Sequence, residues 1–108
     1  MSKPIILIPS YNPDGTLPET ISLLREKGFE RFVIVNDGSR AECAPIFEQV
    51  ADLPGVHLLT HAVNMGKGRA MKTGFNYILW RFPGAGCIVC DADGQHPADS
   101  VADVARGM

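Results

Sequence analysis

The first apolar run of the chain is Pro4-Ile5-Ile6-Leu7-Ile8-Pro9, and the polar segment Ser10-Tyr11-Asn12 follows it directly. A short apolar run without polar alternation is typical of a strand buried on both faces, as in a parallel sheet. Three later runs rich in Val, Ile and Leu have the same character. The pattern predicts strands over residues 4–9, 31–36, 56–61 and 86–90.

The segments between these runs place apolar side chains three or four positions apart, which predicts helices over residues 17–27, 44–51 and 68–80. Gly28 suits a left-handed stop after the first helix, and a last helix is expected after Pro97. Right-handed crossovers return each strand parallel to the previous one. The expected fold is therefore α/β, a mostly parallel β-sheet with helices on both faces.

Length and charge restrict the function. The 108 residues fit a single domain, residues 1–108. Twelve acidic and 10 basic residues give a formal net charge of −2, which argues against nucleic acid as a partner. The three cysteines favour reduced thiols, and Cys87 and Cys90 are expected on opposite faces of a strand. No apolar run reaches the length of about 20 residues that spans a membrane, so we expect a soluble, cytoplasmic protein.

Polar loops follow the four predicted strands. Ligands of parallel sheets gather outside the carboxyl ends of the strands, so these loops are the candidate site. They are Ser10-Tyr11-Asn12-Pro13-Asp14-Gly15, Asn36-Asp37-Gly38-Ser39, Asn64-Met65-Gly66-Lys67-Gly68-Arg69 and Asp91-Ala92-Asp93-Gly94-Gln95-His96.

Asp91 and Asp93 follow the fourth predicted strand. Residues two apart in an extended segment point to the same side about 6–7 Å apart, so both carboxylates can approach one Mg²⁺ or Mn²⁺ ion and its bound phosphates. A plain Asp-Gly turn is the simpler alternative. An EF-hand is excluded because Gln95, His96 and Ala102 replace its acid or amide, glycine and glutamate. A haloacid dehalogenase-like phosphatase with Asp91 as nucleophile remains an alternative, although Gln95 departs from that pattern.

Two other loops suit a nucleotide. The carboxylate of Asp37 can accept a hydrogen bond from a ribose hydroxyl or a nucleobase imide, although a plain turn explains the motif equally well. The glycines beside Lys67 and Arg69 suit a diphosphate at a helix start, although no complete P-loop motif is present and a glycine turn with solvated charges explains the segment equally well. Tyr11 offers a stacking face or packs in the core. His57 and His61 are expected to be satisfied or surface residues.

Taken in chain order, four motifs resemble the donor half of the family 2 glycosyltransferases, closest in style to the polyprenyl-phosphate (dolichol-phosphate mannosyl) transferases. The resemblance implies a GT-A fold and metal-assisted, inverting transfer from a UDP- or GDP-sugar to a polyprenyl phosphate or a glycan. A lipid acceptor would place the protein at the inner membrane face. The motifs are Pro9-Ser10-Tyr11-Asn12, Val35-Asn36-Asp37-Gly38-Ser39, Asn64-x-Gly66-Lys67-Gly68-x-Ala70-x-x-x-Gly74 and Asp91-Ala92-Asp93-Gly94-Gln95-His96-Pro97.

The resemblance also implies roles for single residues. Asp93 matches the metal-binding acid, Asp91 matches its partner that faces ribose or metal, and Asp37 matches the acid that reads the base. The other substrate-binding residues it implies are Pro9, Ser10, Tyr11, Asn12, Gly66, Lys67 and Gln95. The general base and the acceptor region belong to the second half of such enzymes, so we expect residues 1–108 to be a truncated, inactive front part.

A different class of function stays open beside the enzyme. The chain can be a non-catalytic module that recognises a nucleoside diphosphate. Alternatively, it can be a truncated piece that pairs its exposed sheet edge with a second copy of itself.

Overall fold

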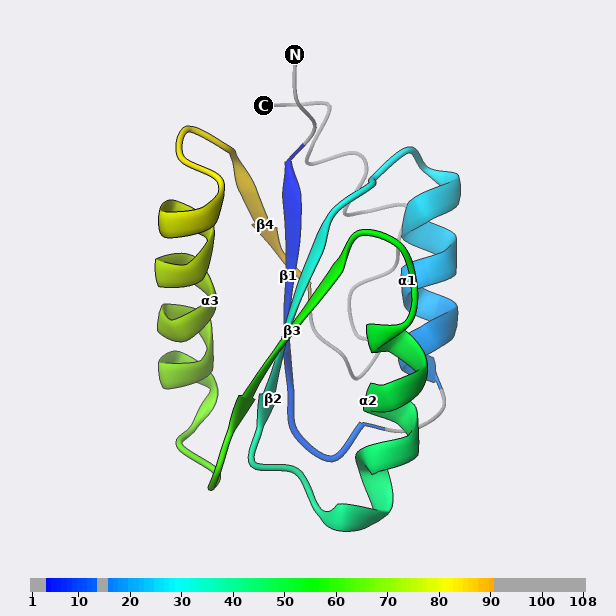
Figure 1. Ribbon diagram of the computed structural model, residues 1–108, viewed down its shortest axis with the longest axis vertical. Coiled ribbons are helices and arrows are strands. Elements are labelled where there is room, and N and C mark those ends of the chain that lie inside the picture. Colours follow the sequence, from blue (N-terminus) through cyan, green and yellow to red (C-terminus); the bar gives the residue numbers. More distant parts are fainter. Residues whose placement is uncertain (1–3, 14–15, 91–108) are drawn as a thin grey trace.

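The computed structural model describes residues 4–13 and 16–90 of the chain. Four strands form one parallel sheet in the order β3-β2-β1-β4 (Figure 1). The predicted α/β fold with a parallel sheet is confirmed, and every predicted strand boundary lies within one residue of the observed one. The strands are β1 (Ile5–Ser10), β2 (Phe32–Asp37), β3 (Val56–His61) and β4 (Cys87–Val89).

Helices cover both faces of the sheet, as predicted. Helices α1 (Thr16–Glu26) and α2 (Ala44–Ala51) lie on one face and α3 (Lys67–Arg81) lies on the other (Figure 1). A short 3₁₀ turn, η1 (Ala41–Cys43), precedes α2 and was not predicted, because three residues are too few to show a helical period. Gly28 has φ 103°, which confirms the left-handed stop after α1. The helix expected after Pro97 lies outside the described residues.

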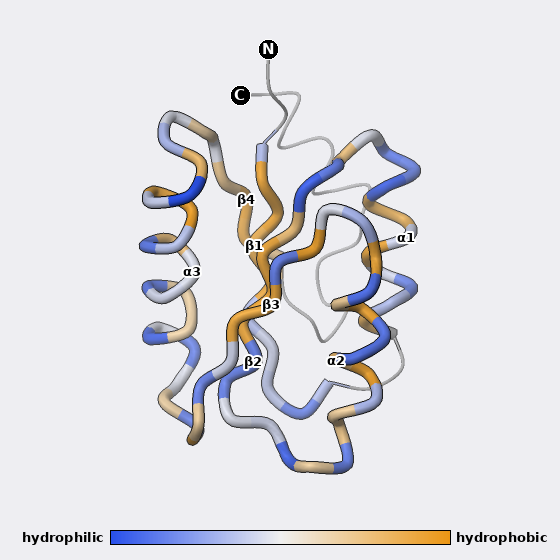
Figure 2. Tube along the Cα trace, viewed as in Figure 1, coloured by the Kyte–Doolittle hydropathy of each residue, from blue (hydrophilic) through white to orange (hydrophobic). Residues whose placement is uncertain are grey.

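Two clusters of buried apolar side chains lie on opposite faces of the central strands β1 and β2. Figure 2 shows the hydrophobic residues concentrated along the strands of the sheet. Side chains alternate along a strand, so Ile6 and Ile8 face α1 and α2 while Ile5 and Leu7 face α3. The cysteines follow the same rule. Cys90 is buried in the first cluster and Cys87 packs against the second, which confirms their predicted placement on opposite faces.

Helix α3 approaches β1 closely because it carries a glycine at the contact. Gly74 is buried, and a Cβ added there would collide with the side chain of Leu7. The close contact lets α3 lie over both β1 and β2. The amino-terminal end of the helix is thereby held near the carboxyl ends of these strands.

An aromatic cluster attaches the other end of α3 to β3. The hydroxyl of Tyr77 lies 2.9 Å from Nδ1 of His57, and the ring of Phe82 meets the His57 ring edge-on at 5.2 Å. Burial lowers the pKa of His57, and the nearby charges of Arg81 and Arg31 lower it further. His57 is therefore a satisfied residue, as expected, and it packs as a neutral ring.

Among the helices of the described part of the chain, none combines the length and the apolar character that a membrane span requires.

Candidate functional site

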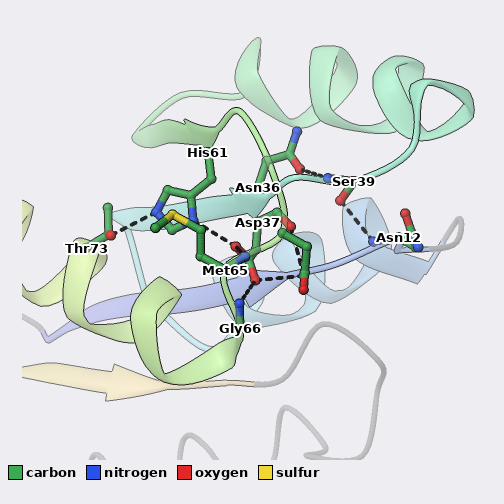
Figure 3. A network of polar contacts seen from close by, with 9 residues as sticks. Asn12, Asn36, Asp37, Ser39, His61, Met65, Gly66 and Thr73 are labelled. Carbon is green, nitrogen blue, oxygen red and sulfur yellow. Dashed lines mark hydrogen bonds and ion pairs between the residues drawn. The ribbon is translucent and has the colours of Figure 1, made fainter.

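The carboxyl ends of β1, β2 and β3 meet at one edge of the sheet. Ser10, the last residue of β1, is paired with Asn36, and Asp37, the last residue of β2, is paired with His61 at the end of β3. The polar loops that the sequence places after these strands therefore begin side by side. Figure 3 shows the contacts that join them.

The loop after β1 is bonded to the loop after β2 through Asn12. Its backbone N–H donates to Oγ of Ser39 at 2.9 Å, and its Oδ1 accepts from the backbone N–H of Arg40 at 2.8 Å. Oδ1 of Asn36 accepts from the N–H of Ser39 at 3.0 Å, which closes the second loop on itself (Figure 3). Asn12 has φ 49°, a left-handed conformation that asparagine tolerates better than most residues.

Asp37 joins the loop after β2 to the loop after β3. It is buried, with 2% of its surface exposed, and its carboxylate accepts four hydrogen bonds from the chain. Nδ1 of His61 lies 2.8 Å from Oδ1, and the Met65 N–H donates to the same oxygen at 2.9 Å. Oδ2 accepts from the side-chain amide of Asn64 at 3.0 Å and from the N–H of Gly66 at 2.9 Å (Figure 3).

These contacts determine the charge of Asp37. Burial raises the pKa of the carboxyl, but the hydrogen bonds from His61, Met65 and Gly66 and the attraction of His61 outweigh burial and hold the pKa below the ordinary value of 3.8. The group is therefore an ionised carboxylate at neutral pH. Its charge is compensated within the protein by the donors that surround it.

Gly38 allows the second and third loops to touch. It has φ 66°, and an added Cβ would collide with the backbone of Val63 and Asn64. A side chain at this position would push the third loop away from Asp37. The glycine in the Asn-Asp-Gly-Ser motif thus serves the contact between loops as well as the turn.

The first turn of α3 presents backbone and positive charge at this edge. Gly66 precedes the helix with φ 97°, and the N–H of Ala70 donates to its carbonyl oxygen at 3.0 Å. A Cβ added to Gly68 would meet no described atom within 4 Å, so the backbone there is open. Residues 67–70 contain Lys67 and Arg69 and no acid. A helix start with this charge favours an anion.

The structure brings together most of the residues that the sequence nominated. Pro9 and Ser10 are buried at the end of β1, and Ser10 Oγ is 3.4 Å from the carbonyl oxygen of Ile8. Tyr11 is 55% exposed, so its alternative interpretation as a core residue is wrong. Lys67 is exposed at the start of α3.

The candidate metal ligands Asp91 and Asp93, together with Gln95, lie outside the described residues. Strand β4 runs parallel to β1, and the N–H of Cys90 donates to the carbonyl oxygen of Leu7 at 2.9 Å. The carboxyl end of β4 therefore points toward the same edge as β1. Within the described part of the chain, no three His, Cys, Asp or Glu side chains are grouped so that they could hold a metal ion.

Two side chains at this edge, His61 and Thr73, were not assigned to the candidate site by reasoning from the sequence, although His61 is a satisfied residue as expected. Nε2 of His61 lies 2.9 Å from Oγ1 of Thr73, so the ring connects Asp37 on β2 to the second turn of α3. The available signal was positional, because His61 ends one predicted strand and Asp37 directly follows another. Without the strand order, however, the sequence does not show that β2 and β3 are neighbours.

The fold is a parallel α/β domain with polar loops joined at one edge of its sheet, and comparison with known proteins gives its family. Residues 5–108 match the family described as Glycosyl transferase family 2. The chain therefore belongs to this family, which confirms the resemblance seen in the four motifs.

Three relatives illustrate the match. The chain is 32% identical over 101 residues to an uncharacterised protein of Methanocaldococcus jannaschii, covering 94% of the chain and 40% of that protein. It is 33% identical over 105 residues to the dolichyl-phosphate beta-glucosyltransferase ALG5A of Trichomonas vaginalis, covering 87% and 31%. It is 31% identical over 107 residues to the undecaprenyl-phosphate 4-deoxy-4-formamido-L-arabinose transferase of Enterobacter sp., covering 92% and 31%. The chain thus spans well under half the length of these relatives.

A solved structure has the same fold. The crystal structure of S. aureus TarS aligns with 96% of this chain and 31% of its own chain, with a TM-score of 0.70 and 20% sequence identity. This similarity confirms the GT-A arrangement of the sheet and helices. At this level of identity it does not extend to substrates.

Proposed function

We propose that this chain forms the donor-binding part of a metal-assisted, inverting glycosyltransferase that uses a UDP- or GDP-sugar. The main support is the edge at which three separate loops are hydrogen-bonded to one another through Asn12 and Asp37. The printed names of two relatives include dolichyl phosphate and undecaprenyl phosphate. These names favour a polyprenyl phosphate over a glycan as the acceptor, with the reaction at the cytoplasmic face of the membrane that holds it.

Different segments along this edge would bind different parts of the donor. The segment from Pro9 to Asn12 would contact the nucleoside, with the exposed ring of Tyr11 as a stacking surface. The first turn of α3, with its open backbone at Gly68 and the cation of Lys67, would hold the diphosphate. Such an arrangement fixes the donor at two points and orients the bond that breaks.

Asp91 and Asp93 would hold a Mg²⁺ or Mn²⁺ ion, and Gln95 would contact the substrate. Carboxylate oxygens are the ligands that these ions prefer, and β4 directs the chain toward the edge where the diphosphate is proposed to lie. A bound ion would neutralise the negative charge that develops on the departing nucleoside diphosphate. The general base that deprotonates the acceptor would come from the remainder of a full-length enzyme.

Titration of the chain with UDP and GDP, with and without Mn²⁺, tests this proposal. We expect weak binding that strengthens with Mn²⁺, loses this dependence in Asp93→Ala, and is accompanied by little or no sugar transfer. Nucleotide binding of equal strength with and without Mn²⁺ would contradict the metal-assisted mechanism. Phosphatase activity lost in Asp91→Asn would favour the phosphatase alternative instead.

Gly68→Ala tests the diphosphate position without straining the fold, because the added Cβ meets no described neighbour. We expect it to weaken binding of both nucleotides. Gly86→Ala is the matched control, since its added Cβ would make an ordinary 3.9 Å contact with Pro4, before β4 and away from this edge. If Gly68→Ala and Gly86→Ala bound UDP and GDP equally well, α3 would not be part of the diphosphate site.

A further inference from the structure

We propose that Asp37 and His61 form a positioning pair, which holds residues 64–66 and the first two turns of α3 in the conformation that receives the diphosphate. The inference rests on the proposed function for the identity of the ligand. The pair itself is a property of the protein without a ligand, so it can be tested separately.

The hydrogen bonds of Asp37 support an internal role. A carboxylate offers about four acceptor positions, and the protein itself supplies four donors to this one. Two of the donors are the consecutive backbone N–H groups of Met65 and Gly66. A buried carboxylate with this many partners organises the backbone around it, because each donor would lose a charge-assisted bond by moving away.

His61 extends the same network to the helix. A carboxylate only accepts hydrogen bonds, so Nδ1 of His61 must carry the proton that is shared with Asp37. Nε2 lies 2.9 Å from the hydroxyl oxygen of Thr73, in the second turn of α3; it accepts from that hydroxyl in the neutral ring and donates to it in the protonated ring. The imidazole therefore connects the end of β2, the end of β3 and α3 in one chain of contacts (Figure 3).

Helix α3 is thus held at two points near its start. Asp37 holds Gly66, whose carbonyl oxygen accepts the first helical hydrogen bond, and His61 holds Thr73. At the start of an α-helix the first backbone N–H groups lack a carbonyl in a preceding turn, so the open backbone at Gly68 can offer a donor to a ligand. Fixing them before the ligand arrives lowers the ordering cost of binding, which is the physical meaning of a positioning role.

A role for Asp37 confined to reading the nucleobase predicts a different pattern of binding. If Asp37 only reads the base, its loss should leave the affinity for a ligand without a base unchanged. If Asp37 and His61 form a positioning pair, loss of either should lower the affinity for every ligand that contacts the first turn of α3. Inorganic pyrophosphate, which has the phosphates and no base, distinguishes the two roles.

The first experiment uses the chain without ligand. Amide hydrogen exchange is followed by NMR for Met65 and Gly66 in the wild type, Asp37→Asn and His61→Ala. We expect exchange of both amides to accelerate by about tenfold or more in the two variants, because their acceptor is lost or displaced. Amides in the middle of β1 and β2 should not change. Unchanged exchange at Met65 and Gly66 would overturn the proposal.

Two further variants separate positioning from general destabilisation. His61→Asn keeps an N–H donor at the place of Nδ1 and should restore most of the protection that His61→Ala loses. His57→Ala removes the other histidine of β3, which contacts Tyr77 at the far end of α3, and is the matched control. Equal effects of His57→Ala and His61→Ala on Met65 and Gly66 would contradict a specific pair.

The second experiment compares pyrophosphate, UDP and GDP as ligands by NMR titration. Asp37→Asn and His61→Ala should lower the affinity for all three ligands by a similar factor. The affinities of His61→Asn should be close to those of the wild type. Weakened UDP and GDP binding with unchanged pyrophosphate binding would overturn the positioning role. If the wild type bound none of the three, the proposed function would fail, while the exchange result would still decide whether the pair holds the loop.

Discussion

Nδ1 of His61 lies 2.8 Å from Oδ1 of Asp37, although the two residues are 24 positions apart in the chain. The contact exists because β2 and β3 are neighbours in register, so the final residues of the two strands are paired. The same carboxylate also accepts from the backbone of Met65 and Gly66, so the contacts that stabilise this edge of the sheet also fix the loop before α3. Stability measurements can therefore report on this edge without any ligand.

Asp37 should make the protein less stable in acid. Its folded-state pKa lies below the ordinary carboxyl value, so the unfolded chain takes up the proton more readily than the folded one. This contribution is present above the unfolded-state pKa, near 3.8, and is lost as the pH falls through the lower folded-state pKa. Urea unfolding from pH 7 to pH 2.5 should show this loss in the wild type.

The Asp37→Asn variant checks the assignment. It should be destabilised by about 1–3 kcal/mol at pH 7, since buried N–H donors lose a charged acceptor. Its stability relative to the wild type should improve toward low pH, where the wild-type carboxylate is protonated. A difference that stayed constant over the whole range would assign the acid sensitivity to other groups.

His57 should produce a second pH dependence at higher pH. Its folded-state pKa is lowered from 6.5 by burial and by Arg81 and Arg31, so the protonated ring is favoured in the unfolded chain. The stability it contributes is present above pH 6.5 and declines as the pH falls through the unfolded-state value toward the folded-state one. Thermal unfolding of wild type and His57→Phe between pH 5 and pH 8 measures this. In His57→Phe, stability should no longer fall between pH 8 and pH 5 as it does in the wild type. The same pH dependence in both proteins would exclude His57 as its source.

Gly74→Ala should destabilise the fold by about 1–3 kcal/mol, because the new methyl group overpacks the contact between α3 and Leu7. Gly68→Ala is the control on the same helix. It adds a methyl group where no described atom lies nearby, so better helix propensity should leave stability unchanged or slightly raised. Denaturant midpoints compare the two, and equal midpoints would mean that α3 does not depend on close approach to β1.

Ser39→Ala should lower the unfolding free energy by about 1 kcal/mol, since the backbone N–H of Asn12 loses its acceptor. Ser22→Ala, at an exposed position on α1, provides the comparison and should change stability little. Amide exchange at Asn12 should accelerate in the first variant only. Protection that survived in Ser39→Ala would show that another acceptor holds the first loop.

The sequence by itself determined which segments are strands and helices. Uninterrupted apolar runs such as residues 5–8 and the three-to-four spacing in α3 reflect local burial, which leaves a direct trace in the order of residues. The rule that ligands gather at the carboxyl ends of parallel strands also selected the loops after β1, β2 and β3, which the folded chain brings together. Recognition of the family followed from the same four motifs.

Only the tertiary structure decided what these loops do to one another. The order β3-β2-β1-β4 makes Asp37 and His61 neighbours, and it brings the backbone of Met65 and Gly66 to a carboxylate more than 25 positions away. Strand order depends on packing energies summed over the whole sheet, and no local pattern records it. For this reason the sequence nominated Asp37 as a ligand contact, while its four internal hydrogen bonds and the part played by His61 and Thr73 became visible only in the folded chain.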